Sequence, residues 1–142
     1  MPKNPPEGYH TLISQAVVDD ARGMLDFVKE VFDGEILEIH EEDERIRHSE
    51  VKIGDSRLMV ASTNEEFGVF PVMVNVYVDD VDATHARAVE RGAINLRPPE
   101  DQFYGDRTAG VLDVHGNQWW ISTHIEDVSP EEMQRRIEEM AG

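Results

Sequence analysis

The sequence predicts an α+β fold built from two βαβββ modules, because the chain repeats itself. Three landmarks return in the same order at a spacing of about 60 residues, and such a period is the mark of a duplicated structural unit. They are a strand end with two aspartates, a glycine that ends a helix and a glycine that opens the last apolar strand: 17–20 and 76–80, Gly34 and Gly92, Gly54 and Gly116. We expect a single domain over 1–142, with modules at about 8–63 and 70–124 and a short C-terminal helix at about 129–141.

The first module is expected to contain a strand, a helix and three further strands. Residues 9–18 are rich in Ile, Val and Thr, which favours a strand. Asp19 or Asp20 can cap a helix that begins near Ala21 and ends at Gly34. Apolar residues at three- and four-residue spacing give that helix one buried face: Met24, Leu25, Phe27, Val28, Val31 and Phe32. The further strands are expected at 35–40, 45–53 and 56–62.

The second module repeats this order and is followed by the C-terminal helix. Its strands are expected at 71–78, 94–97, 107–113 and 117–123, and its helix at about 81–91. Arg97–Asp106 contains two prolines and is expected to be a long loop, and such loops are often functional. Ser129, Pro130 and Glu132 form the pattern of a helix N-terminus. A thin apolar stripe on this last helix suits packing onto a neighbour: Met133, Ile137 and Met140.

Composition and charge exclude several classes of function. The 142-residue chain has no cysteine, and no apolar stretch approaches the roughly 20 residues of a membrane helix. Its net charge is −17, from 30 acids against 13 Lys and Arg. Nucleic acids and anionic membranes both attract a basic surface, so neither is an expected partner. We expect a cytoplasmic protein whose acidity reflects either a salt-rich environment or ordinary solubility.

Four segments carry a resemblance to a known family: Gly8–Thr11, His48–Ser56, Glu100–Arg107 and Thr123–Glu132. With the βαβββ repeat, they resemble the vicinal-oxygen-chelate superfamily of glyoxalase I, extradiol dioxygenases and bleomycin-resistance proteins, and within it the PhnB-like branch. The resemblance implies a homodimer and a cleft between the two sheets. It implies no single activity, because the superfamily hosts many chemistries on one scaffold.

The resemblance also implies four positions for metal ligands, on the first and last strands of each module. The two-residue period gives the positions on the first strands, and a count of four residues from Gly54 and Gly116 gives those on the last strands. The side chains there are Ile13, Leu58, Met73 and Trp120. Zinc and nickel prefer imidazole, carboxylate or thiolate ligands. A shift by two residues brings in Gln15 and Asn75, which are poor ligands. The sequence therefore predicts no metal ion at these positions and no cofactor.

One pair of residues could still act as an acid–base catalyst. His48 and Glu50 lie two residues apart on an expected strand, so an imidazole lies beside a carboxylate on one face. The alternative is a solvated edge pair, because Lys52 continues the same face.

The segment 103–107 suits ligand binding. The rings of Phe103 and Tyr104 can stack on a planar molecule. Arg107 can hold a carboxylate or phosphate with two parallel hydrogen bonds, and Asp106 can orient its guanidinium. The alternative is a structural turn in which the arginine pairs with an acid of its own chain.

These residues lead to one favoured function and two alternatives. The favoured function is metal-independent binding of a small organic molecule in the cleft, of the bleomycin-resistance type. The residues expected to bind it by stacking or polar contacts are Gln15, Asn75, Tyr77, Phe103, Tyr104, Asp106, Arg107 and Trp120. The first alternative is a glyoxalase-like lyase or isomerase that uses His48 and Glu50. The second is a structural or partner-binding module whose cleft is collapsed.

Overall fold

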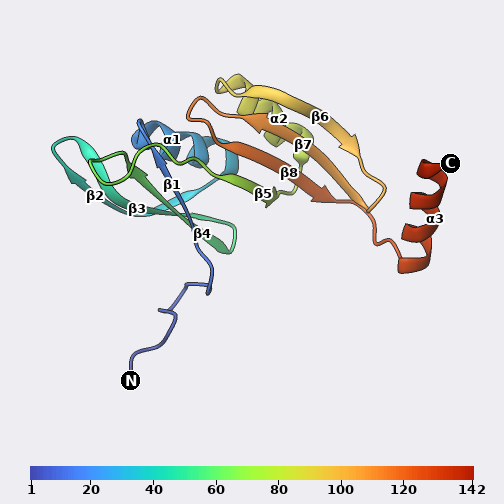
Figure 1. Ribbon diagram of the computed structural model, residues 1–142, viewed down its shortest axis with the longest axis horizontal. Helices are drawn as coiled ribbons and strands as arrows, with labels where there is room; N and C mark the ends of the chain where they lie inside the picture. Colours follow the sequence, from blue (N-terminus) through green and yellow to red (C-terminus); the bar gives the residue numbers. More distant parts are fainter. The chain divides into compact units, whose positions relative to one another are not determined.

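The computed structural model describes residues 1–142 as two compact units (Figure 1). The first unit comprises Met1–Val72 with Val114–Asn117, and the second comprises Met73–Asp113 with Gln118–Gly142. The elements of the first unit are β1 Ser14–Val18, α1 Ala21–Phe32, β2 Glu35–Glu42, β3 Arg45–Ile53 and β4 Ser56–Ser62. Those of the second are β5 Met73–Tyr77, α2 Val81–Glu90, β6 Ile94–Asp101, β7 Asp106–Leu112, β8 Gln118–His124 and α3 Pro130–Ala141. The predicted α+β fold with two βαβββ modules and a C-terminal helix is confirmed.

The two sheets have the same topology. Their strand orders are β1-β4-β3-β2 and β5-β8-β7-β6. In each sheet the first and last strands of the module pair in parallel, and the other neighbours pair antiparallel. The duplicated pattern in the sequence therefore corresponds to a duplicated hydrogen-bond pattern.

Helix α1 forms the core of the first unit with its sheet. The Asp20 side chain accepts a hydrogen bond from the Gly23 N–H at 2.9 Å, which caps the first turn. All six residues of the predicted apolar face are buried. At the other end, Gly34 is required by space, because a Cβ there would lie 2.8 Å from Val28 Cγ1 and 3.0 Å from Val51 Cγ2. The glycine therefore lets the chain turn closely against β3.

The predicted loop Arg97–Asp106 is wrong over most of its length. Strand β6 continues through both prolines to Asp101, and the chain turns only between there and Asp106. Because β6 is an edge strand, a proline in it removes no hydrogen bond that the sheet needs. The pairing with β7 shifts between Arg97 and Glu100, where the prolines lie. Proline therefore marks a bulge on an edge strand here.

The predicted strand at 9–18 is also shorter than expected, because β1 begins only at Ser14. The residues before it form an arm in which the Tyr9 N–H donates to the Pro6 carbonyl. None of the helices is long and apolar enough to cross a membrane.

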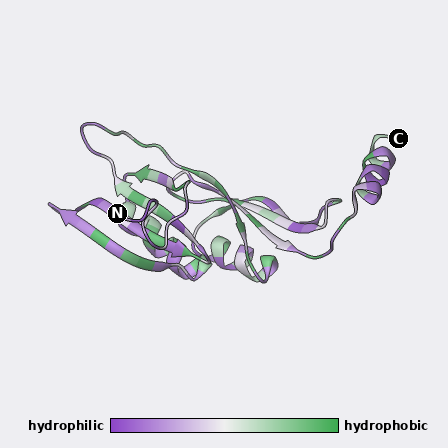
Figure 2. Cartoon of the chain, turned by 90° about the horizontal axis from the view of Figure 1, so that it is seen from below, coloured by the Kyte–Doolittle hydropathy of each residue, from purple (hydrophilic) through white to green (hydrophobic).

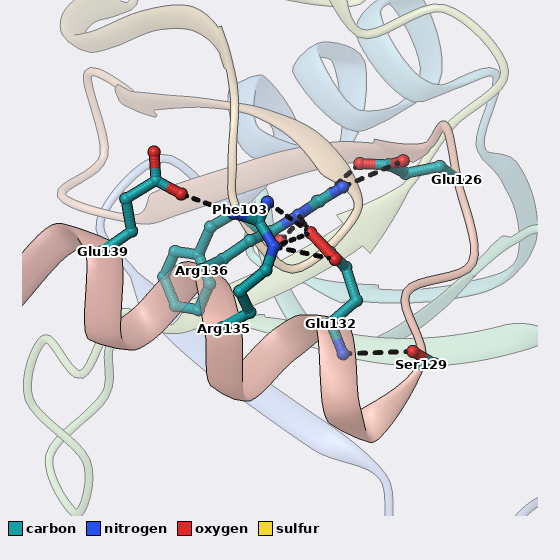
Figure 3. A network of polar contacts seen from close by, with 7 residues as sticks. All are labelled: Phe103, Glu126, Ser129, Glu132, Arg135, Arg136 and Glu139. Carbon is teal, nitrogen blue, oxygen red and sulfur yellow. Dashed lines mark hydrogen bonds and ion pairs between the residues drawn. The ribbon is translucent and has the colours of Figure 1, made fainter.

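Helix α3 is held to the β6–β7 turn by one arginine (Figure 3). The Arg136 guanidinium donates to the Phe103 carbonyl at 2.9 Å and pairs with Glu126 at 2.7 Å. At the start of the helix, Ser129 accepts from the Glu132 N–H, as the capping pattern predicts. None of the residues of its apolar stripe is buried. Most of the helix is hydrophilic (Figure 2), and the expected homodimer contact stays a prediction.

The cap of α1 gives a test of the fold. We expect Asp20→Ala to lower the free energy of unfolding by about 1 kcal/mol, because the N-terminal amides of the helix lose their acceptor. Urea denaturation measures the loss. Asp26→Ala, which removes an exposed acid from the same helix, is the matched control and should change stability by less than about 0.5 kcal/mol. Equal losses in both variants would show that the cap contributes nothing.

Candidate functional site

Strand pairing fixes which side chains share the face of each sheet opposite its helix, here called the helix-free face. Residues directly paired across strands point to the same side. In the first sheet one row on this face is Gln15, Met59, Glu50 and Glu38. The corresponding row in the second sheet is Asn75, Trp120, Gly110 and Arg97. The residues between them in sequence, such as Val51 and Trp119, are fully buried on the helix side.

The prediction for Leu58 is wrong by one residue. Leu58 pairs with Val51 and therefore points to the helix side, where it is 5% exposed. Met59 occupies the place that corresponds to Trp120, because Met59 pairs with Gln15 and Trp120 pairs with Asn75. Counting from the glycine failed because the strand after Gly54 is offset by one residue from that after Gly116, and such a shift exchanges the two faces.

The corrected positions still lack metal ligands. The four positions hold Ile13, directly before β1, and Met59, Met73 and Trp120 on β4, β5 and β8. None of them offers an imidazole, carboxylate or thiolate, and thioethers bind zinc or nickel weakly. The residues present therefore do not fit the metal that members of the resembling family hold at these positions.

Trp120 lies across a glycine of the neighbouring strand. A Cβ at Gly110 would lie 2.4 Å from Trp120 Cζ3, so the indole covers this backbone at close range. The ring is partly exposed, and its Nε1–H donates to Gln118 Oε1 at 3.1 Å. The Arg97 guanidinium carbon lies 5.0 Å from the ring centroid, which is the geometry of a cation–π contact. Trp120 thus lies on the helix-free face of its own sheet, and its orientation toward a cleft between the modules stays a prediction.

A second group on the same face centres on a buried aspartate. Asp106 accepts hydrogen bonds from the Tyr77 hydroxyl at 2.7 Å and from His124 Nδ1 at 2.8 Å. Burial opposes the charge on Asp106, but the two donors outweigh it and lower the carboxyl pKa. The hydrogen bond that Tyr77 donates to Asp106 raises the pKa of the Tyr77 hydroxyl. The pKa of His124 is raised by its bonds to Asp106 and Asp127.

Thr108 completes this face with an unused polar group. It lies between Asp106 and Gly110 on β7 and is 6% exposed, yet its hydroxyl has no hydrogen-bond partner. A buried hydroxyl without a partner is costly in a folded protein. Its donor and its acceptor are therefore both unused within this chain.

Arg107 points to the other side of the sheet. Its Nε and Nη2 donate to the two oxygens of Asp82 on α2 at 2.8 and 3.0 Å, and its Nη1 donates to Asp101 at 3.0 Å. These bonds raise its pKa further. Arg107 therefore pairs with acids of its own chain, which is the alternative that the sequence left open. Asp106 does not orient it, because consecutive strand residues face opposite sides.

Phe103 and Tyr104 lie at the β6–β7 turn. Their rings meet edge to face with centroids 5.2 Å apart. Phe103 also gives its carbonyl to Arg136 of α3, so the turn has a structural role that the sequence did not reveal. Stacking of either ring on a ligand stays a prediction.

His48 and Glu50 form part of a network in the first unit. His48 Nε2 lies 3.0 Å from Glu50 Oε2, while Tyr9 donates to Glu50 Oε1 at 2.6 Å and Arg57 at 3.2 Å. Burial raises the pKa of Glu50, but these three hydrogen bonds outweigh it, so the net shift is downward. The sequence prediction missed Tyr9 and Arg57. Arg57 could have been identified because the two-residue period of its strand puts it on the same face as Glu50. No pattern in the sequence around Tyr9 indicates its contact with Glu50.

Gln15 borders a hollow in the first unit. The hollow has a volume of about 490 Å³ and is lined by Gln15, Val17 and Glu66–Phe70. This size lies within the range of small-molecule pockets. Phe67 and Phe70 are 53% and 74% exposed, so the apolar wall of the hollow is accessible within this unit.

Comparison with known proteins adds a family and several relatives. The model of the Glyoxalase/Bleomycin resistance protein/Dioxygenase superfamily matches residues 10–121. An uncharacterized protein of Mycobacterium bovis is 31% identical over 130 residues, covering 83% of this chain and 86% of that protein. The crystal structure of TioX from Micromonospora sp. ML1 superposes with a TM-score of 0.70 at 26% identity, covering 82% of this chain and 99% of TioX. PhnB protein from Bacillus cereus shares the fold with a TM-score of 0.64 at 15% identity, covering 80% and 99%.

The His124 network gives a pH-dependent prediction. The folded pKa of His124 is raised above the ordinary value of 6.5, so its stabilisation is full below that pH and is lost as pH rises through the folded pKa. We expect the urea midpoint of the wild type, relative to His124→Asn, to fall as pH rises from about 6 through neutral pH. His85→Asn, at a half-buried histidine on α2 that is not part of this network, is the matched control. A wild type and a His124→Asn variant with parallel pH profiles would contradict the assignment.

The contact between Gly110 and Trp120 gives a second prediction. Gly110→Ala should displace the indole and destabilise the protein by about 1–3 kcal/mol, because the added methyl overlaps the ring. Urea denaturation measures the stability, and a red shift of tryptophan emission reports the displaced ring. Gly68→Ala is the control, since nothing lies within 4 Å of a Cβ there. If Gly110→Ala is as stable as Gly68→Ala, the close packing is not present.

Proposed function

Because this chain belongs to the Glyoxalase/Bleomycin resistance protein/Dioxygenase superfamily, we propose that it binds a small planar organic molecule without a metal ion. The binding surface is the helix-free face of β5, β7 and β8, around Trp120 and Tyr77. This makes the chain a binding protein of the bleomycin-resistance type. The resemblance to the PhnB-like branch is part of the same proposal.

The observation that carries the proposal is the position of Trp120. An indole that lies flat over Gly110 presents a broad apolar surface, and a planar ligand gains about 0.5–1.5 kcal/mol from stacking beyond the area that it buries. Arg97, beside this ring, forms no ion pair with any acid of the chain. Since only the cation–π contact with Trp120 holds it, its guanidinium can move aside and bind a polar edge of the ligand.

Neighbouring side chains supply the remaining contacts. Met73 and Tyr77 are 66% and 68% exposed, so their apolar surfaces are available beside the indole within the second unit. Thr108 and Asn75 offer polar groups on the same face. A mostly apolar surface with a few placed polar groups is typical of a small-molecule site. The absence of ligating side chain types at the family positions makes this binding metal-independent.

The enzyme alternative has one observation in its favour. The 3.0 Å contact between His48 and Glu50 is the geometry of a base with its orienting carboxylate. Glu50 is held ionised by its three donors, so it would orient the imidazole and His48 would take the proton. Turnover of an α-keto aldehyde that is lost in His48→Gln would establish this lyase or isomerase activity in place of simple binding.

The binding proposal is tested with a panel of planar aromatic compounds. In a Trp119→Phe protein, Trp120 is the only tryptophan, so quenching of its emission reports ligand at this face. We expect Trp120→Leu to weaken binding about 10-fold or more in calorimetry, because the stacking surface is lost. Phe67→Leu, in the wall of the hollow in the first unit, is the matched control and should bind as the wild type does. Loss of binding in Phe67→Leu with retention in Trp120→Leu would overturn the proposal.

A further inference from the structure

Four side chains of metal-ligand type gather on the helix-free face of the first sheet. Glu38 pairs directly with Glu50 across β2 and β3, and His40 pairs with His48 in the next row. Pairing across strands places two imidazoles and two carboxylates on one side of the sheet. The strands that carry them are not those at which the superfamily is expected to hold a metal, which are β1, β4, β5 and β8.

The donor atoms of Glu38, His48 and Glu50 lie within 4.8 Å of one another, and His40 adjoins this group through Glu38. His48 Nε2 lies 3.0 Å from Glu50 Oε2 and 3.4 Å from Glu38 Oε1, and His40 Nε2 lies 3.6 Å from the same oxygen of Glu38. Bonds of about 2.0–2.2 Å to a tetrahedral ion place neighbouring donors about 3.3–3.5 Å apart. One ring nitrogen of His48 thus faces two carboxylate oxygens at the separation that a shared zinc ion would set.

The buried member of the cluster is held in position by groups that are not ligands. Glu50 is 3% exposed, and its Oε1 is fixed by the Tyr9 hydroxyl at 2.6 Å and by Arg57 at 3.2 Å. Its Oε2 is left for His48 alone. Carboxylate ligands of metal sites are oriented in this way by outer hydrogen bonds. Arg57 is also stacked on the Tyr9 ring at 4.2 Å, so its charge is kept at the far oxygen.

The pairing of β2 with β3 is irregular on both sides of Glu38 and His40. The pairing shifts between Ile36 and Glu38 and again between His40 and Glu41. The two irregularities flank the segment that carries the two ligands of β2. Bulges at a sheet edge change the direction of the side chains next to them. The two bulges therefore set the directions in which the Glu38 and His40 side chains leave the edge strand.

We propose that the first unit binds a zinc-type divalent transition metal ion through Glu38, His40, His48 and Glu50. Imidazole with carboxylate suits zinc, whereas magnesium and calcium prefer oxygen ligands alone. The ion lies between His48 and the two carboxylates and joins β2 to β3. The site uses only residues of the first unit, and the inference does not depend on the proposed function.

The test is calorimetric titration of the full chain with zinc chloride in excess magnesium chloride. Magnesium occupies loose acidic surface sites, which a chain of net charge −17 offers in number. We expect one zinc ion per chain. Affinity should fall about 100-fold or more in His48→Ala and Glu38→Gln, which lose a ligand, and about 10-fold in Tyr9→Phe, which loses an orienting bond. His85→Ala removes a histidine on α2 and should bind zinc as the wild type does.

An NMR titration of the wild type with zinc tests the same site without relying on the folding of any variant. Zinc should shift the imidazole NMR signals of His40 and His48 and leave those of His85 and His124 in place. Equal zinc affinity of wild type and His48→Ala would overturn the proposal. So would a binding heat that excess magnesium abolishes, or zinc-induced shifts confined to other histidines.

Discussion

The two-residue period of the strands is the constraint on which the chemistry of this protein depends. Each sheet must bury one face against its own helix, so every second residue is committed to the core. Trp119 and Trp120 show the consequence most clearly. Trp119 is fully buried and donates to Asp113 at 2.8 Å, while its neighbour lies on the other face and remains partly exposed. Two identical side chains thus have different roles because the backbone alternates.

The duplicated scaffold carries different chemistry in its two copies. Glu50 in the first sheet and Gly110 in the second occupy corresponding places beside Met59 and Trp120. A buried carboxylate requires hydrogen-bond donors, and the first unit provides them through His48, Arg57 and an arm that brings in Tyr9. Gly110 at the corresponding place has no side chain that needs a partner, and the Trp120 indole packs over its backbone. The exchanges of Met59 for Trp120 and of Glu50 for Gly110 therefore separate a polar network in one sheet from an aromatic surface in the other.

The sequence predicted the elements well where periodicity was strong, and it failed where register or tertiary context decided. The apolar face of α1 and its cap at Asp20 follow from local spacing, and both are present. Leu58 was assigned to the wrong face because a glycine count does not detect a one-residue offset between the modules. Arg107 was expected to face a ligand because its partner Asp82 lies 25 residues away on α2. The two prolines of β6 suggested a loop, although an edge strand accepts them.

The candidate site was predicted in part for the same reasons. Tyr77 and Asn75 were assigned to one face by parity and Trp120 by its count from Gly116, and the pairing of β5 with β8 agrees. The contacts that give this face its character come from elsewhere. Gly110 and Arg97 are brought to Trp120 by β7 and β6, and His124 is brought to Asp106 by the pairing of β7 with β8. Cross-strand neighbours depend on register, which a single sequence specifies only through the turns between strands.

In a chain this acidic, an arginine without an acidic partner indicates a surface that can bind a ligand, and Arg97 is such an arginine. Most arginines of the protein are held by carboxylates, as Arg107 is by Asp82 and Arg136 is by Glu126. With 30 acids present, an arginine finds an anionic partner easily. Arg97 instead lies over an indole, on an edge strand whose bulge directs it to the helix-free face. A cation that stays unpaired in a strongly negative chain raises the affinity of that face for electron-rich or anionic groups, which the rest of the surface repels.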